Sequence, residues 1–221
     1  MKIYPVIHHL DAVTSLAQAA LVNACGADGL FLISHGEHDA ALPKLAYAVK
    51  QEHQDLSVGI NLLSLQPHKA VDLARAHLLD MVWLDNAGVS SGGVTEEGRY
   101  LESCLASSMR PLLIFAGVAF KHQSPEPDPA AAAREAKAAG FIPTTSGVAT
   151  GQAPDLQKIK AMSEAADGEL AVASGITPAN VRQYSPFVSH VLVATGISHD
   201  FHHLDAEALR ELVRVARELP A

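Results

Sequence analysis

Short apolar runs alternate with longer segments of helical periodicity along the whole chain. The apolar runs are rich in β-branched and aromatic residues and show little polar alternation, which is typical of strands covered on both faces. They predict eight strands, at 3–7, 29–34, 57–63, 81–85, 111–120, 141–147, 170–175 and 190–196. The strands begin about every 20 to 30 residues, which is the length of one βα unit.

The segments between these strands have the 3.6-residue period of helices. They predict eight helices, at 12–26, 42–53, 69–79, 95–108, 129–140, 154–166, 178–184 and 205–219. Three of them begin at or near a proline (Pro129, Pro154 and Pro178), and Gly26 and Gly140 stand where a helix-ending glycine belongs.

A strict alternation of eight βα units is the pattern of a (β/α)8 TIM barrel. No linker rich in Pro, Gly or Ser divides the sequence, so we expect one domain spanning residues 1–221. A doubly wound open sheet is the alternative, because alternation alone does not show closure. The barrel is favoured because open sheets more often have five or six strands.

Composition excludes several functional classes. The chain has 16 Lys and Arg against 24 Asp and Glu, a net charge of −8, and no basic stripe, so we expect no nucleic-acid partner. No apolar run reaches the ~18 residues of a membrane span, and the N-terminus turns polar too early for a signal peptide. Cys25 and Cys104 lack CxxC spacing, which argues against a disulfide framework or a zinc site. These features predict a cytoplasmic protein. Homo-oligomers are frequent among barrels, so the sequence does not decide between a monomer and a homo-oligomer.

Histidine is unusually frequent, with 12 residues. Seven follow the last strand and the first two strands, which are consecutive around a closed barrel: His8, His9, His35, His38, His199, His202 and His203. Such histidines are either solvated or helix-capping, or they bind a ligand, transfer protons or hold a metal. No HxH or HExxH spacing identifies ligands, so no metal site is assigned.

Catalytic residues in a TIM barrel gather at the carboxyl ends of the strands. An aspartate there can act as a base or orient a hydroxyl, and a lysine can hold an anion, form a Schiff base or act as an acid. Either can also be an ordinary loop charge. Trp83 lies inside its strand and is assigned to the core. The catalytic candidates are Asp85, Lys121 and His9, and the candidates for substrate contacts are Asn61, Asp39, His35 and His122.

Three successive turns, after the sixth, seventh and eighth strands, combine glycine with Ser or Thr. Glycine lets backbone N–H groups approach a phosphate, and a helix N-terminus adds favourable partial charge. The alternative is that these glycines only form tight turns. The predicted phosphate contacts are Gly147, Thr150, Gly151, Ser174, Gly175, Thr195 and Gly196. The expected partner is a small phosphorylated metabolite, and no cofactor is predicted.

Several motifs resemble one known family. GVATGQAPDL (147–156) and VASGITPANVRQYSPFVSHVLVATGIS (172–198) are similar to the C-terminal half of the BtpA/SgcQ family, and the TEEG turn (95–98) and the closing helix (204–217) also match. The resemblance implies a barrel of the ribulose-phosphate-binding type. It also implies a link to photosystem I assembly or stability, with which the first named member is associated.

The chain departs from the family pattern in three places. Ser34-His35 stands where the family usually has an acidic residue and Asn, Ser198-His199 replaces a lysine region, and Gly140–Pro143 stands where strand 6 usually begins with Asp. From the resemblance we therefore expect the phosphate cradle to be retained and the substrate half of the pocket to be specialised.

Three functions remain in view. The leading hypothesis is an isomerase or lyase that acts on a sugar-phosphate-like metabolite through an enediolate or an imine, with Lys121 or a histidine stabilising the developing oxyanion. The second is a non-catalytic assembly or stability factor for a larger complex, and the third is a metal-dependent hydrolase that uses the His-rich barrel mouth.

Overall fold

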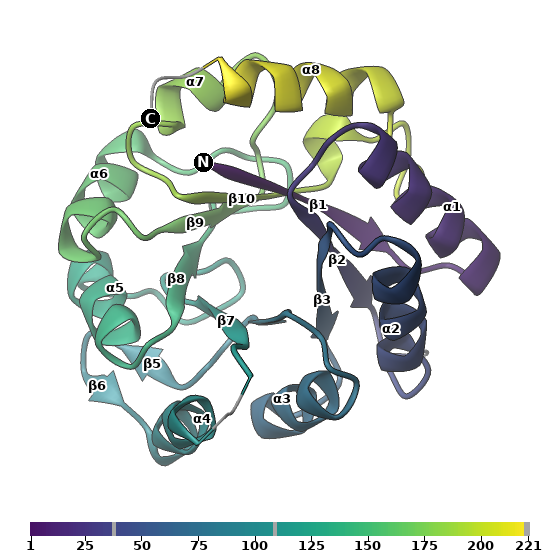
Figure 1. Cartoon of the computed structure of the whole chain (residues 1–221). Helices are drawn as coiled ribbons and strands as arrows, with labels where there is room; N and C mark the ends of the chain where they lie inside the picture. The colour runs from purple at the N-terminus through teal and green to yellow at the C-terminus, as the bar shows by residue number, and fades with distance from the viewer. Residues whose placement is uncertain (37–38, 108–109, 219–221) are drawn as a thin grey trace.

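The computed structural model describes residues 1–36, 39–107 and 110–218. Its parallel strands form a closed ring (Figure 1) in which β1 pairs with both β2 and β10. In chain order the ring consists of β1 (Lys2–His8), β2 (Gly29–Ser34), β3 (Ser57–Leu62), β4 (Met81–Leu84), β7 (Leu113–Gly117), β8 (Ile142–Thr145), β9 (Ala171–Ala173) and β10 (His190–Val193). The predicted (β/α)8 barrel is confirmed, and the open-sheet alternative is wrong.

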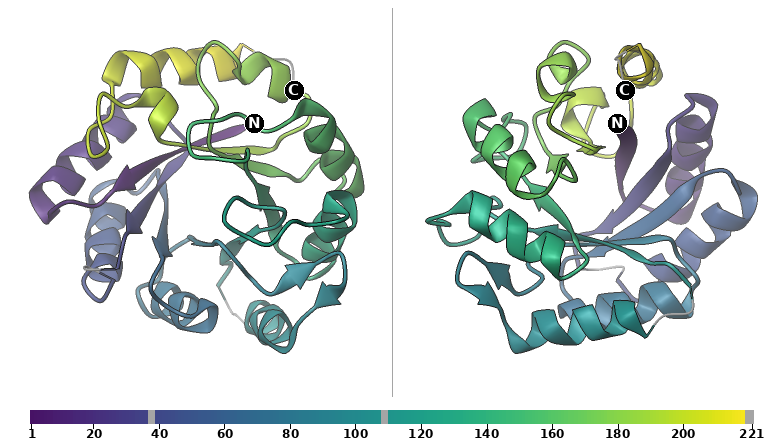
Figure 2. Two further views of the ribbon diagram at one scale, coloured as in Figure 1. Left: turned by 180° about the vertical axis from the view of Figure 1, so that it is seen from behind. Right: turned by 60° about the vertical axis from the view of Figure 1, so that its left-hand side comes forward.

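Helices encircle the strands in every view (Figures 1 and 2). They are α1 (Ala12–Ala24), α2 (Leu42–Glu52), α3 (Pro67–Ala76), α4 (Glu96–Ala106), α5 (Pro129–Ala138), α6 (Leu156–Ala165), α7 (Val181–Tyr184) and α8 (Ala206–Arg217). A 3₁₀ turn, η1 (Thr195–Ile197), follows β10. Five helices begin after a side chain that accepts a backbone N–H bond and so caps the first turn: Asp11, Thr95, Asp128, Asp155 and Asp205.

Two predicted helix starts shift for local reasons. Because Asp155 caps α6, Pro154 lies before the helix instead of inside it. In the segment before α7, the Thr177 N–H donates to Asn180 Oδ1, which forms a separate turn and delays the helix to Val181. Both shifts involve side-chain hydrogen bonds to the backbone, a cap at α6 and a preceding turn at α7, which apolar periodicity does not record.

A small hairpin interrupts the βα alternation after β4. Its strands, β5 (Val89–Ser90) and β6 (Gly93–Val94), pair antiparallel outside the barrel and lie beside α5 (Figure 1). The apolar pattern does not predict this hairpin, because two residues per strand are too few to show a period. The hairpin lengthens the loop that leaves the end of β4.

The barrel interior is filled by aromatic side chains. The rings of Tyr4, Phe31 and Phe115 contact one another edge to face, with centroids 5.3–6.0 Å apart. Trp83 packs above them and is 6% exposed, as predicted for a core residue. A mainly aliphatic layer fills the space between strands and helices. This packing leaves free volume at the carboxyl ends of the strands, where the loops carry the candidate residues.

Some sequence predictions fall on residues outside the described part of the chain. They are His38, Ser108 at the end of the predicted helix 95–108, and Leu219 at the end of the predicted helix 205–219. Within the described residues, no helix is both long and apolar enough to span a membrane.

Candidate functional site

A cavity of about 270 Å³ opens at the carboxyl ends of the barrel strands. Its floor is apolar and includes Trp83. Seven of the sequence-predicted residues line it: Asp85, Lys121, His35, His122, Thr150, Ser174 and Thr195. The loops after β2, β4 and β7 supply the charged and imidazole groups, and those after β8, β9 and β10 supply the hydroxyl groups. We call this space the mouth cavity.

Asp85 directly follows β4 and is held by Asn61 at the end of β3. The Asn61 amide Nδ2 donates to Asp85 Oδ1 over 3.0 Å, and Asn61 itself is only 2% exposed. Burial raises the pKa of Asp85, while the Asn61 hydrogen bond and the nearby Lys121 charge act against that rise. A raised pKa makes the carboxylate a stronger base, which favours a role in general acid–base catalysis.

Lys121 follows β7 and is anchored at both ends. Its backbone N–H donates to Ser146 Oγ (2.8 Å), and its Nζ donates to Thr150 Oγ1 (3.1 Å). Burial lowers the pKa of Lys121, and the Asp85 charge opposes this effect. A lowered pKa increases the fraction of neutral amine, which is the nucleophilic form of lysine.

Two further side chains hold the loops in place, and sequence reasoning missed both. Lys158 Nζ donates to the carbonyl oxygens of Ala119 (2.7 Å) and Ser146 (3.1 Å), and burial lowers the pKa of Lys158. Gln123 Nε2 donates to the carbonyl oxygens of Asp85 (2.6 Å) and Gly117 (2.9 Å). Lys158 lies on α6, away from any strand end, so its position in the sequence carries no signal for this role.

Ser174 organises the loops that carry the predicted phosphate contacts. Its hydroxyl accepts from the Gly151 N–H over 2.9 Å, and its φ is +96°, a left-handed conformation that is costly for a residue with a side chain. The N–H of Gly175, the next residue, has no acceptor among the described residues. A constrained backbone with a free N–H beside a cavity has the character of an anion-binding turn.

The glycines of these loops also meet a packing requirement. A Cβ at Gly147, Gly175 or Gly196 would lie 2.0–2.2 Å from backbone atoms of Gln152, Ala153 or Ile176, respectively. Tight packing of one loop on the next is therefore enough to explain these glycines. The contribution of their N–H groups to phosphate binding stays a prediction.

The histidine-rich sector contains a hydrogen-bonded pair. His8 Nδ1 lies 2.8 Å from His35 Nε2, so one ring donates and the other accepts. The Phe201 ring packs against both, with centroids 4.1 Å from His8 and 5.2 Å from His35. Burial, followed by the neighbouring His35, lowers the pKa of His8 to about 4. The pair is therefore uncharged at neutral pH and forms an aromatic edge of the mouth cavity.

Other histidines and Asp39 are engaged elsewhere. His9 Nδ1 lies 2.8 Å from Ser15 Oγ at the start of α1. Asp39 Oδ2 accepts hydrogen bonds from the backbone N–H and the hydroxyl of Ser64. Neither His9 nor Asp39 lines the mouth cavity. Their positions therefore do not support the predicted catalytic role of His9 or the predicted substrate contact of Asp39. Within the described residues, no three His, Cys, Asp or Glu side chains form a set that could hold a metal ion.

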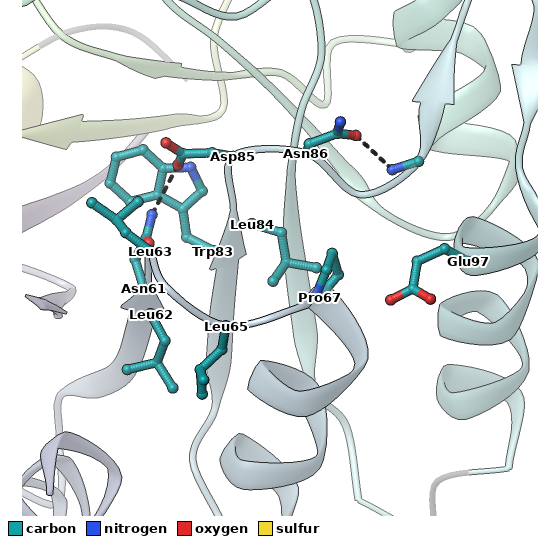
Figure 3. Close-up of a pocket in the computed structure, with 11 residues that line it drawn as sticks. Asn61, Leu62, Leu63, Leu65, Pro67, Trp83, Leu84, Asp85, Asn86 and Glu97 are labelled. Carbon is teal, nitrogen blue, oxygen red and sulfur yellow. Dashed lines mark hydrogen bonds between the residues drawn. The ribbon is translucent and has the colours of Figure 1, made fainter. Parts of the chain in front are cut away.

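A second cavity, of about 330 Å³, lies between the loops that follow β3 and β4 (Figure 3). It shares Leu63, Trp83 and Asp85 with the mouth cavity, so the two spaces adjoin at Asp85. We call it the side cavity. The sequence pattern does not predict this cavity, because its walls are leucine and proline side chains that look like ordinary core residues.

Known structures share the fold at low sequence identity. Phosphoribosyl anthranilate isomerase from Thermus thermophilus is 17% identical, with a TM-score of 0.67 and all of both chains covered. The dimeric enzyme of that name from Thermotoga maritima, in a monomeric form, is 16% identical, with a TM-score of 0.68 over 99% of this chain and 100% of that one. 2-Keto-3-deoxy-6-phosphogluconate aldolase from Zymomonas mobilis ATCC 29191 is 15% identical, with a TM-score of 0.64 over 99% and 93%.

These likenesses show the barrel fold. No curated protein sequence matches the chain. The model of the BtpA family, in contrast, matches residues 15–218. This range includes every strand except β1 and every strand-end loop except the one that follows β1. The chain therefore belongs to the BtpA family.

Proposed function

We propose that this barrel is an enzyme that binds a small phosphorylated metabolite in the mouth cavity and carries out proton-transfer chemistry of the isomerase or lyase class. The observation that carries the proposal is the composition of the cavity. Asp85 and Lys121 line it together with Thr150, Ser174 and Thr195. Its volume of about 270 Å³ suits a small molecule.

The hydroxyl side supports an anion-binding role. Thr150 and Thr195 supply hydroxyl donors, the Ser174 hydroxyl donates to the Ala149 carbonyl oxygen (3.4 Å), and the Gly175 N–H has no acceptor among the described residues. A chain with a net charge of −8 has few cations to spare for an anion. Phosphate binding would therefore depend on these neutral donors, supported by Lys121, whose Nζ donates to Thr150 Oγ1.

Asp85 and Lys121 support two routes for the chemistry. In the first, Asp85 removes a proton next to a substrate carbonyl, and the Lys121 ammonium stabilises the enediolate oxygen. In the second, the neutral Lys121 amine adds to the carbonyl to give a carbinolamine, which loses water to form an imine. A fold relative, KDPG aldolase from Legionella pneumophila, was crystallised with pyruvate as a covalent carbinolamine, and such an adduct requires an amine.

Proton exchange tests the first route. Wild-type protein incubated with ribulose 5-phosphate in D₂O should incorporate deuterium at the carbon next to the carbonyl. Asp85→Asn, which keeps the shape and loses the base, should slow this exchange about 10²–10⁴-fold. Asp72→Asn, at an exposed position of α3 that does not line the cavity, is the matched control and should retain most of the rate. Exchange by Asp85→Asn at the wild-type rate would remove Asp85 from the mechanism.

Reductive trapping tests the second route. Incubation with pyruvate and cyanoborohydride should add one reduced adduct at Lys121, and Lys121→Met should abolish it. A trapped adduct favours the lyase, and deuterium exchange without an adduct favours the isomerase. If the wild-type protein shows neither activity and inorganic phosphate does not bind, the enzyme proposal fails, and the hypothesis of a non-catalytic assembly factor replaces it.

A further inference from the structure

The charged side chains that line the side cavity are all acidic. Leu63, Leu65 and Pro67 form apolar walls, and the charged groups that line it are the carboxyl groups of Asp85 and Glu97. Figure 3 shows the Glu97 carboxylate on the side that faces Pro67. No basic side chain is among its described lining residues. The mouth cavity, by comparison, contains Lys121.

Glu97 is held as an anion. Its Oε1 accepts from the His68 backbone N–H over 3.0 Å and lies 2.9 Å from His68 Nδ1. Partial burial acts in the opposite direction, but the hydrogen bonds from His68 keep the pKa of Glu97 below its usual value. A second carboxylate in this space would be repelled by Glu97.

Trp83 lies where the two cavities adjoin. It is only 6% exposed, and it lines both cavities. Its indole Nε1 is buried and has no hydrogen-bond partner among the described residues. Figure 3 shows the indole beside Asn61 and Asp85. Because the indole lines both cavities, its surroundings change when a ligand extends from the mouth cavity into the side cavity.

We infer that the side cavity is the subsite for the end of the substrate remote from its phosphate, and that this end is partly apolar and carries no anionic group. The inference rests on the proposed function, because it assumes that the phosphate lies near Ser174. It narrows the substrate class to phosphate monoesters whose other end has no carboxylate. The substrate would then extend past Asp85, with its reactive carbons over that carboxyl group.

A matched ligand pair tests the inference. Both ligands are 1-amino-1-deoxy-ribulose 5-phosphates in reduced form. One bears an o-carboxyphenyl group, as in the compound bound to a phosphoribosyl anthranilate isomerase, and the other bears a phenyl group. We expect the phenyl ligand to bind at least about tenfold more tightly by calorimetry, a difference of the size that one charge repulsion supplies.

The chain contains one tryptophan, so the indole N–H of Trp83 gives a single side-chain resonance in a ¹⁵N spectrum. The phenyl ligand should shift this resonance further than inorganic phosphate does, because phosphate reaches only the mouth cavity. Glu97→Gln keeps an oxygen for the His68 N–H and removes the charge, so it should reduce the preference for the phenyl ligand several-fold. Glu96→Gln, on the exposed adjacent position, is the matched control and should leave the preference unchanged.

The outcomes separate the two proposals. Equal affinity for the two ligands, or a Trp83 shift no larger than the one that inorganic phosphate causes, overturns the inference about the side cavity while leaving the phosphate site in place if inorganic phosphate still binds. Failure of inorganic phosphate and of both ligands to bind overturns the proposed function and the inference together.

Discussion

His190 is a buried titratable residue away from the mouth cavity. It is 7% exposed on β10, its ring stacks on Tyr4 with centroids 5.7 Å apart, and it contacts Phe115 edge to face at 5.3 Å. Burial, followed by the Lys2 charge, lowers the pKa of His190 to about 4. The folded barrel therefore holds this imidazole in its neutral form.

This burial predicts an acid-sensitive fold. Between pH 6.5 and 4 the unfolded chain binds a proton at His190 and the folded chain does not, so the free energy of unfolding falls as the pH falls through that window. His190 accounts for up to about 3 kcal/mol of this loss. His190→Phe keeps the ring packing and should flatten the dependence, as measured by urea unfolding at several pH values.

His122→Gln serves as the control, because that ring is exposed, and it should keep the wild-type dependence on pH. Some dependence should survive in His190→Phe, since His8 also has a pKa lowered to about 4. An unchanged slope in His190→Phe would show that His190 does not carry the effect.

At this scale the sequence indicated Asp85 and Lys121 through their positions after strands, and both lie at the mouth cavity. The predicted catalytic histidine was His9, whereas the histidine of β1 that lines the mouth cavity is His8. Side chains on a strand alternate, so His8 shares the inward face with Tyr4 and Val6 of the interior core, and His9 does not. The unbroken apolar run hid this alternation, because both faces of the strand are covered.

The loops after β9 and β10 pack backbone against backbone. A Cβ on Gly196 would lie 2.0 Å from the Ile176 carbonyl oxygen, although the φ of Gly196 is not in the left-handed region. Gly196→Ala should therefore destabilise the fold by about 1–3 kcal/mol through steric overlap alone. Thermal unfolding measures this loss.

Gly92→Ala is the matched control. Gly92 lies in the hairpin turn, also without a left-handed φ, and its added Cβ would meet only Ser90 Oγ at 3.5 Å. This variant should stay close to the wild-type stability. Equal effects at the two positions would contradict the role of loop packing.

The elements themselves were largely predictable, because each strand and helix of the ring carries a strong apolar pattern. The β5–β6 hairpin was not, since Val89 and Val94 are its only paired apolar residues. The side cavity was not predictable either. The cavity depends on the distance between the loop after β3 and the loop after β4. The residue pattern within one segment does not indicate the distance to another segment.

At the scale of the molecule, Asp28 links the first and last elements of the chain. Its Oδ2 accepts from the Ile3 N–H over 2.8 Å, and its Oδ1 lies 2.9 Å from Arg217 Nη2 on α8. The Asp28 backbone also bonds to Ile3 and Ser57, in β1 and β3. Asp28 thus joins three strands and the final helix at the amino ends of the strands.

Asp28→Ala should destabilise the whole barrel, because it leaves the buried Ile3 N–H without its acceptor. The expected loss is about 1–3 kcal/mol in the free energy of unfolding, measured by chemical denaturation. Glu211→Ala removes the partner of Arg214 on the exposed face of the same helix and should cost less than about 1 kcal/mol. Comparable losses in the two variants would argue against a special role for Asp28.

The contacts of Lys158 have a consequence for motion. One ammonium group binds a carbonyl of the loop after β7 and a carbonyl of the loop after β8, and the Ser146 hydroxyl between them receives the Lys121 N–H. The two loops are therefore coupled mechanically, and their fluctuations should be correlated. The entropy of ordering Lys121 and Thr150 relative to each other is lost once, when the chain folds, instead of each time a ligand arrives.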